Sequence, residues 1–338
     1  MIQDARVLHD EFVPLQVEYR NQELNRLSEA LAPCIDENRE STPENTFIYG
    51  PTGTGKTCIA KYTLEQLAEE APRVNTAYVN CWQDYNKFRT IERLMEGLGK
   101  GDGIDSRWIA KDEMIARLRN ELSRPYMVIL DEVDQHEEPG ILYDLYTLPH
   151  ITMILIANRE TELFHRLDDR VTSRLRGAPR IRLSKYTSDQ ITAILEKRVK
   201  WGLHPDAIGT PELEFIAETA AGDARVAISI LRSAANHAQR GGHEEITEDL
   251  IEEAVPGARE EIRQKTLEKL DGHQLRLYNI IEEYGEIAPG VLYEEYEAQS
   301  EEPMTRRTVR NYLNKMEHYR LIEASGQSRA KVYTIANG

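Results

Sequence analysis

An eight-residue glycine-rich run has the composition and spacing of a phosphate-binding loop. The run Gly50-Pro51-Thr52-Gly53-Thr54-Gly55-Lys56-Thr57 reads G-x-x-x-x-G-K-T. Glycines let the backbone curve closely around a phosphate, so that its N–H groups and the N-terminus of the next helix bind the anion. In such a loop the lysine reaches the β- and γ-phosphates and the threonine hydroxyl holds Mg²⁺. We therefore expect these residues, with Cys58 directly after them, to bind ATP or ADP together with Mg²⁺.

Two carboxylates end a hydrophobic run further along the chain, where Asp131 and Glu132 follow Val128-Ile-Leu. Asp131 is expected to hold the Mg²⁺ shell, while Glu132 would orient or deprotonate the attacking water. The next hydrophobic run ends at Asn158, whose amide can hydrogen-bond the γ-phosphate or the water. An asparagine after a strand is often a turn residue, but its place after the two motifs favours a role at the nucleotide.

The elements that must position these residues are short strands alternating with amphipathic helices. The strands are predicted at 46–49, 76–80, 126–131, 152–157 and 180–183. This alternation predicts right-handed crossovers and an α/β fold with a doubly wound parallel sheet. Residues 1–45 read as a polar lead-in, and four helices are predicted at 188–202, 210–220, 223–240 and 247–254. Pro256-Gly257 is expected to interrupt the helical region, with a helical connector after it, which divides the chain into 1–183, 184–257 and 258–338.

The C-terminal residues 273–338 predict three helices and a strand pair, an arrangement that resembles a winged helix. Thr305 can cap the third helix, on which Val309, Leu313 and Met316 recur at helical spacing and form a core face. Polar residues remain for the outer face of this helix and for the strand pair. These candidate DNA-binding residues are Arg306, Arg307, Arg310, Asn311, Lys315, Arg329 and Lys331.

Charge is segregated within an acidic chain of net charge −16. Residues 303–338 carry seven basic residues and two acidic ones, a local net of +5, whereas 278–302 carry eight acidic residues and no basic one. The local positive charge favours DNA at the third helix. A protein partner, or pairing of the helix with the acidic block, is the alternative. Of the 42 basic residues only 12 are lysine, which resembles proteins of salt-loving archaea.

Other features of the composition exclude some classes of protein. The three cysteines, Cys34, Cys58 and Cys81, show no metal or redox spacing. The strongest apolar run, 151–157, has the length of a strand and not of a membrane span. The N-terminus has no signal-peptide pattern. We therefore expect a cytoplasmic, nucleoid-associated protein with no membrane contact.

Together these motifs resemble the archaeal replication initiators, which combine the roles of the origin recognition complex and its cell-division-control partner within the extended AAA (AAA+) ATPases. The resemblance extends to a segment near the start that carries Val13, Pro14 and Arg20 on the adenine side, and to a linker in which Tyr186 packs near adenine. It implies that Arg225, in Gly222-Asp-Ala-Arg225, is a lid arginine that reaches back to the nucleotide. It also implies that Arg170 or Arg174 is an arginine finger for a neighbouring subunit's ATP.

The resemblance implies a slow, regulatory ATPase that recognises double-stranded origin DNA, self-associates on it and helps to load the replicative minichromosome-maintenance helicase. Two features differ from the family pattern. Ala157 replaces a serine, and the segment where the family has a DNA-contacting insertion is acidic, with Asp84, Glu92 and Glu96, which does not favour DNA contact there. Two alternatives remain: a clamp-loader or helicase-loader type ATPase acting mainly on protein partners, and a nucleotide-switched transcription regulator.

Overall fold

The computed structural model describes residues 1–35, 44–101, 111–159, 163–164, 166–167, 169–326 and 331–336. The chain divides into two compact units, Met1–Thr247 and Glu248–Gly338. No helix in the described part of the chain combines the length and hydropathy that a membrane span requires. The domain boundaries expected after residues 183 and 257 stay predictions.

The first unit is built on five parallel strands in the order β2-β3-β4-β1-β5. This confirms the predicted doubly wound parallel sheet. Because neighbouring strands are parallel, their carboxyl ends lie at the same edge of the sheet. The residues that follow β1, β3 and β4 therefore meet at that edge. The strands are β1 (Thr46–Tyr49), β2 (Asn75–Asn80), β3 (Tyr126–Asp131), β4 (Ile151–Ala157) and β5 (Arg180–Arg182).

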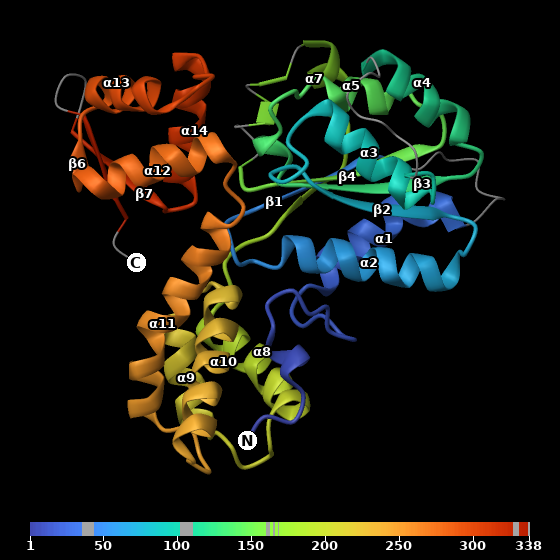
Figure 1. The fold of residues 1–338 in the computed structure, drawn as a ribbon. Helices are drawn as coiled ribbons and strands as arrows, with labels where there is room; N and C mark the ends of the chain where they lie inside the picture. The colour runs from blue at the N-terminus through green and yellow to red at the C-terminus, as the bar shows by residue number, and fades with distance from the viewer. Residues whose placement is uncertain are drawn as a thin grey trace. The chain divides into compact units, whose positions relative to one another are not determined.

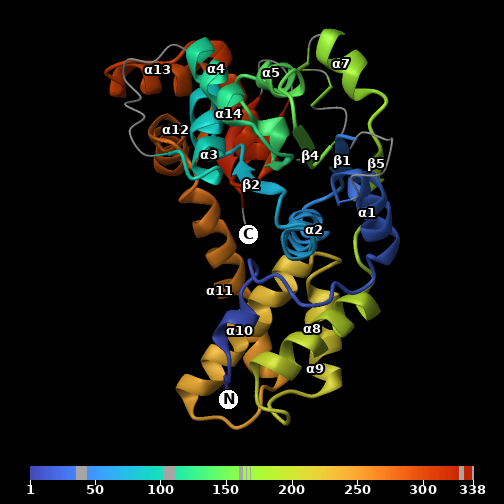
Figure 2. The same ribbon diagram turned by 90° about the vertical axis from the view of Figure 1, so that its right-hand side faces the viewer.

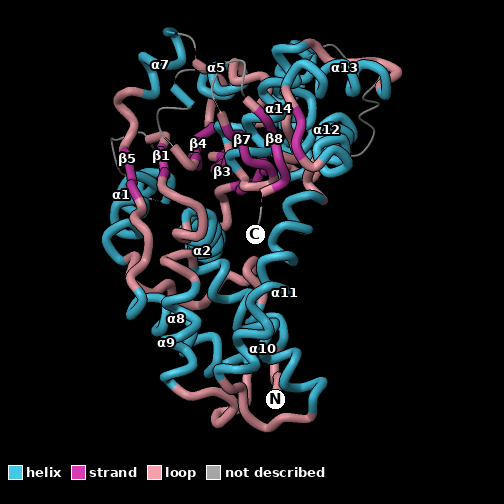
Figure 3. Tube along the Cα trace, turned by 90° about the vertical axis from the view of Figure 1, so that its left-hand side faces the viewer, coloured by secondary structure: helices cyan, strands magenta, loops and turns pink. Residues whose placement is uncertain are grey.

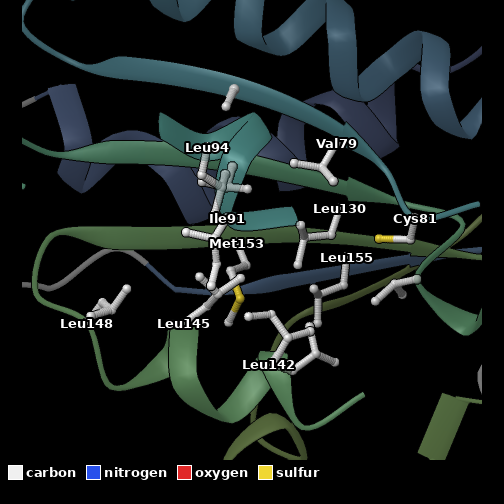
Figure 4. Close-up of a cluster of buried hydrophobic side chains, with 14 of the residues drawn as sticks. Val79, Cys81, Ile91, Leu94, Leu130, Leu142, Leu145, Leu148, Met153 and Leu155 are labelled. Carbon is white, nitrogen blue, oxygen red and sulfur yellow. The ribbon is translucent and has the colours of Figure 1, made fainter. Parts of the chain in front are cut away.

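Helices cover both faces of this sheet (Figure 1). In β3, Met127 and Ile129 belong to one buried cluster while Val128 and Leu130 belong to the other, because successive side chains of a strand point to opposite faces. Figure 4 shows Leu130 among the apolar residues of the second cluster. One face carries α1 (Asn21–Ile35) and α2 (Lys56–Glu70), and the other carries α3 (Lys87–Gly97), α4 (Lys111–Glu121), α5 (Ile141–Tyr146) and α7 (Asp169–Leu175).

Helix α1 corrects the expectation that residues 1–45 are a polar lead-in. Leu27 and Leu31 lie one helical turn apart and are buried against the sheet, at 0% and 2% exposure. Leu24 packs against the same cluster, so the apolar residues recur at the spacing of a helix. The periodic signal was present in the sequence but was obscured by the polar residues between these leucines.

Three further helices of the first unit form a bundle: α8 (Ser188–Gly202), α9 (Thr210–Thr219) and α10 (Ala224–Gly241). Their bounds agree with the predicted helices to within one residue. Thr187 begins α8 with a capping box that includes Gln190. The N-terminal residues run along this bundle (Figure 2), where the short 3-10 helix η1 (Ala5–Leu8) contacts α8 and Ile2 bridges to Leu203.

The second unit begins with α11 (Glu248–Leu267), which runs through Pro256. The interruption expected at Pro256-Gly257 was therefore wrong, and the helical connector expected after it continues the same helix. Ile251, Ala254 and Ala258 recur at helical spacing across the proline, and a periodic apolar face can outweigh the lost hydrogen bond of one proline.

The rest of the second unit is α12 (Gly272–Tyr284), β6 (Glu286–Ile287), α13 (Pro289–Gln299), α14 (Arg306–His318), β7 (Ile322–Ser325) and β8 (Val332–Ile335). Strands β7 and β8 lie beside α12 and α14 (Figure 3). The antiparallel sheet has the order β6-β8-β7, and its two-residue strand β6 is too short for a sequence pattern to predict. Val309, Leu313 and Met316 are buried in the core, as their spacing predicts.

Candidate nucleotide site

The predicted phosphate loop lies between β1 and α2, with Lys56 as the first residue of the helix. Gly53 and Gly55 have positive φ angles of 70° and 87°, a conformation that side chains other than glycine rarely adopt. A Cβ at Gly50 would lie 2.2 Å from the backbone oxygen of Leu183. The loop therefore requires glycine at these three positions, and its curvature presents backbone N–H groups at the N-terminus of α2.

Lys56 is buried, and its ammonium group bonds three oxygens of the site. Its Nζ donates to Gly50 O and Pro51 O at 2.7 Å each, and to Asn158 Oδ1 at 3.0 Å. Burial lowers the pKa of Lys56 to about 8, and the charge of Arg225 adds to this lowering, while Asp131 opposes it. A polyphosphate would restore the opposite charge that this buried cation needs. The Asn158 contact brings the end of β4 to the loop, as predicted.

Asp131 is 4% exposed at the end of β3 and accepts hydrogen bonds on both oxygens. Thr57 Oγ1 donates to Oδ2 at 2.7 Å and the Glu132 backbone N–H to Oδ1 at 2.9 Å. Sequence analysis missed a third donor, the Tyr78 hydroxyl, which lies 2.9 Å from Oδ2. Burial, together with the charge of Asp131, raises the pKa of Tyr78 well above its usual range, so the phenol remains a donor.

Glu132, expected to act on the attacking water, is half-buried and follows Asp131 directly. Its backbone has φ 54° and ψ 38°, in the left-handed region. A non-glycine residue in such a conformation costs on the order of 1–3 kcal/mol, and these strained residues gather at functional sites. The strain identifies Glu132 as a residue whose position is imposed by the surrounding fold.

The helix bundle contributes residues to the same site. Asp223 caps α10 by accepting from the backbone N–H groups of Arg225 and Val226, at 3.0 and 3.2 Å. The next backbone N–H, of Ala224, donates to Gly53 O at 3.1 Å. The Nε of Arg225 is buried and has no hydrogen-bond partner among the described residues. The start of α10 therefore lies against the phosphate loop, with a buried arginine donor beside it.

Arg20 and Tyr186, both predicted on the adenine side, lie together. The Arg20 guanidinium stacks on the Tyr186 ring, 4.1 Å from its centroid, and its Nε donates to the phenolic oxygen at 3.2 Å. Its Nη2 donates to Thr54 O at 3.0 Å and Ser184 O at 2.8 Å, and its Nη1 to Glu23 at 3.2 Å. Arg20 thus links α1, the phosphate loop and the segment that leads into the helix bundle.

Val13 and Pro14 are half-buried in the N-terminal segment that reaches α1. Arg198 of α8 fixes the residues just before them, donating to the carbonyls of Val7 at 2.5 Å and Phe12 at 3.1 Å. Sequence analysis missed Arg198, because an arginine on a helix gives no sign of such a contact. Burial raises the pKa of the Cys58 thiol to about 11, so the thiol stays protonated at neutral pH.

Arg170 and Arg174, the two candidates for the arginine finger, are exposed on α7. Their guanidinium groups lie 5.5 and 4.9 Å from the centroid of the Tyr143 ring on α5. Arg174 also donates to Arg170 O at 3.0 Å. Both side chains are presented at the surface, where a finger for a neighbouring molecule's nucleotide must lie.

The loop that follows Glu132 is held by His136, which is 1% exposed. Its Nε2 lies 3.0 Å from Thr90 Oγ1 of α3, and its Nδ1 accepts from the Glu138 backbone N–H at 3.0 Å. Arg166 donates to the backbone oxygens of Asp134 and His136. These bonds connect the position of Glu132 with α3.

A pH dependence of stability follows from His136, because burial lowers its pKa from 6.5 to about 4. The unfolded chain then binds a proton that the folded chain excludes, so the free energy of unfolding falls as pH drops from about 6.5 to 4, by ~3 kcal/mol. We expect His136→Gln to reduce this slope in denaturant unfolding at fixed salt, while also lowering stability at pH 7. Parallel curves for the variant and the unaltered protein would contradict the assignment.

The predicted DNA-binding residues lie on and beside α14. Arg306, Arg307, Arg310 and Asn311 are exposed, as predicted. Lys315 is 9% exposed and was wrongly placed on the outer face. It lies three residues after the buried Tyr312, so the two share one face of α14, and the stem of a lysine packs readily against apolar neighbours. Lys331 is half-buried over the Tyr333 ring, and Arg329 lies outside the described residues.

Some charges of α14 and of the acidic segment 84–96 are paired within the protein. Arg306 lies 3.8 Å from Glu297 of α13, so the acidic block takes up part of the positive charge of α14. In the acidic segment, Arg93 pairs with Asp84 at 3.4 Å and with Glu96 at 2.7 Å. Arg307 and Arg310, the other two arginines of α14, are exposed.

Two known domain families match the chain. Residues 39–167 match an AAA domain, and residues 192–255 match a Cdc6 AAA+ ATPase-type lid domain. The first match contains the phosphate loop, Asp131, Glu132 and Asn158, and the second contains α8–α10 with Arg225 and continues into α11. The helix bundle is therefore the lid.

Relatives at full length give the same result. The chain is 44% identical over 337 residues to ORC1-type DNA replication protein 9 of Halobacterium salinarum, covering 100% of this chain and 94% of that one. It is 48% identical over 311 residues to ORC1-type DNA replication protein 1 of that organism, covering 92% and 100%. The structure of the Aeropyrum pernix ORC1 protein in complex with DNA is 26% identical with a TM-score of 0.80, covering 99% and 93%.

Halobacterium salinarum, the source of both relatives, is a halophile. This agrees with the acidic, lysine-poor composition of the chain. The identity extends through the phosphate loop, the lid and the C-terminal unit, since it covers the whole chain. The chain belongs to the ORC1-type DNA replication proteins, and it is a nucleotide-binding AAA+ ATPase that acts as a replication initiator.

Proposed function

We propose that the site binds Mg²⁺ with ATP or ADP, and that the bound nucleotide controls engagement of origin DNA. The backbone of Gly50–Thr57 would surround the β- and γ-phosphates, with Lys56 as their counter-charge. Val13, Pro14, Cys58 and Tyr186 would form the adenine side. The four contacts of Arg20 favour a role in holding Tyr186 and the loop.

Thr57 and Asp131 are the residues that would hold Mg²⁺. A hydroxyl and a carboxylate oxygen 2.7 Å apart fit the preference of this ion for hard oxygen ligands. The described residues contain no cluster of three or more His, Cys, Asp or Glu side chains suited to a metal, which agrees with an ion that takes most of its ligands from phosphate and water. When bound, Mg²⁺ neutralises phosphate charge.

Hydrolysis would depend on Glu132 as the base, or the orienting group, for water and on Asn158 beside the γ-phosphate. Arg225 would supply charge from the lid, and its buried Nε supports this role. The lid could therefore respond to the presence of the γ-phosphate. We infer slow, regulatory turnover, and an arginine finger at Arg170 or Arg174 that requires self-association on DNA.

We further infer that the C-terminal unit is a winged helix, with α14 entering the major groove and the β7–β8 pair as its wing. The DNA in the Aeropyrum pernix ORC1 complex supports DNA as the partner. The observation that carries this proposal is the exposure of Arg307 and Arg310 on α14 in a chain of net charge −16. The minichromosome-maintenance helicase, and a cytoplasmic location on the nucleoid, follow as further parts of the proposal.

Substitution of one exposed arginine tests the DNA interface. We expect Arg310→Ala to weaken binding of the AT-rich intergenic duplex flanking this gene by about 1–3 kcal/mol if it reads a base edge. Fluorescence anisotropy in molar KCl measures the change. Arg240→Ala, which removes an exposed arginine at the end of α10, is the matched control. Unchanged affinity of Arg310→Ala on any duplex would indicate that the C-terminal unit faces a protein.

A further inference from the structure

The Asp131 carboxylate has one hydrogen-bond donor that belongs to none of the nucleotide-binding motifs. Tyr78 of β2 donates to Oδ2 at 2.9 Å, the same oxygen that accepts from Thr57 Oγ1 at 2.7 Å. The other oxygen, Oδ1, accepts from the Glu132 backbone N–H. Three donors from β2, α2 and the end of β3 therefore fix this carboxylate in one orientation.

The fold places Tyr78 there through strand register. Strand β2 pairs with β3 so that Tyr78 lies opposite Ile129 and Asn80 opposite Asp131. Residues two apart in a strand share a face, and side chains lean along the strand. A tyrosine two residues before the end of β2 is therefore long enough to reach a carboxylate at the end of β3.

A residue of helix α2 also contacts the ring of Tyr78. Lys61 Nζ lies 4.2 Å from the centroid of the Tyr78 ring, within the range of a cation–π contact. Lys61 is four residues after Thr57, so both side chains lie on one face of α2. One helix face thus bonds Asp131 directly through Thr57 and holds the ring of Tyr78, which bonds the same oxygen.

We propose that Tyr78 is a positioning residue for Mg²⁺, holding the Asp131 carboxylate in the orientation that metal binding requires. The inference rests on the proposed roles of Thr57 and Asp131. Without the phenol, Oδ2 retains Thr57 as its one side-chain donor among the described residues. The carboxylate is then held less firmly, and Mg²⁺ binding has to order it. The nucleotide contacts of the phosphate loop and the adenine side do not involve Tyr78.

The test is Tyr78→Phe, with the affinity of a fluorescent ADP analogue measured in EDTA and across a Mg²⁺ titration. We expect the affinity in EDTA to stay within about 2-fold, while the Mg²⁺ concentration for half-maximal tightening rises about 10-fold, as for loss of a hydrogen bond to a charged group. An unchanged Mg²⁺ midpoint would overturn the proposal. A loss of nucleotide affinity in EDTA as large as the loss in Mg²⁺ would also overturn it, because the substitution would then disturb the structure of the site and not metal binding.

Tyr126→Phe is the matched control, since it removes another phenol of the same sheet. Its hydroxyl is buried and donates to Leu94 O at 2.6 Å, away from Asp131. We expect this variant to keep the Mg²⁺ midpoint of the unaltered protein, and a shift as large as that of Tyr78→Phe would overturn the proposal. Failure of the underlying metal site looks different, because Mg²⁺ would then fail to tighten the nucleotide in the unaltered protein and Thr57→Ala would change nothing.

Discussion

Lys56→Ala is expected to remove nucleotide binding, with an affinity loss of at least about 100-fold for both ADP and ATP. Charge-assisted hydrogen bonds contribute about 1.5–3 kcal/mol each, and the lysine would make more than one to the phosphates. Its three present contacts, to Gly50, Pro51 and Asn158, keep the ammonium group inside the loop at 2.7–3.0 Å. The variant loses the one positive charge that this buried loop itself supplies to the phosphates.

Isothermal titration with ADP and with a non-hydrolysable ATP analogue measures this loss. Lys100→Ala is a suitable control. Lys100 is an exposed lysine outside the phosphate loop, and it pairs with Glu121 at 3.4 Å. Circular dichroism should show that both variants keep the fold. Tight nucleotide binding by folded Lys56→Ala would contradict the assignment of the phosphate loop.

Glu132→Gln is expected to separate binding from turnover. The amide keeps the size of the side chain and its backbone conformation of φ 54°, but it cannot take a proton from water. General-base groups contribute about 10²–10⁴-fold to rate, so hydrolysis should fall by that factor. ATP affinity should remain, because Lys56, Thr57 and Asp131 are unchanged.

Single-turnover hydrolysis with radiolabelled ATP, together with filter binding, measures both quantities on one sample. Glu137→Gln provides the control, since Glu137 is an exposed carboxylate in the same loop. A hydrolysis rate equal to that of the unaltered protein would transfer the role of base to another group. Loss of ATP binding would instead indicate that Glu132 supports the loop.

The nucleotide motifs could be predicted because their chemistry is local. A phosphate loop needs glycine at positions of positive φ, such as Gly53 and Gly55, and its lysine and threonine follow at once. The strands that carry these motifs are short, buried on both faces and rich in apolar residues, so their bounds were predicted to within one residue. Asn158 was predicted from its order along the chain, and strand pairing brings it to Lys56.

The contacts that the sequence did not reveal join residues far apart along the chain. Tyr78 meets Asp131 because of the register of β2 and β3, and Arg198 meets Val7 because the N-terminal segment runs along the lid. Neither residue type nor spacing encodes such pairings. Lys315 shows the complementary error, since its charge suggested the surface while it shares one face of α14 with the buried Tyr312.

The lid contacts give the nucleotide a physical route to control the protein. The start of α10 bonds Gly53 through Ala224, and a side chain at Gly53 would collide with Asp223 at 1.8 Å. Any movement of the phosphate loop on nucleotide exchange must therefore alter this contact. A ligand shifts a conformational equilibrium only by its difference in affinity for the two states, so the proposed control of DNA binding requires ATP and ADP to differ in this respect.

The most direct test of this account is the affinity of the intact protein for the intergenic duplex in molar KCl, measured by fluorescence anisotropy with ATP and with ADP. A shuffled duplex and Lys56→Ala serve as controls. We predict selective binding of the intergenic duplex, an affinity that differs between the two nucleotides, and no nucleotide dependence in Lys56→Ala. Equal binding of both duplexes, or equal affinity with ATP and ADP in the unaltered protein, would contradict a nucleotide-controlled initiator.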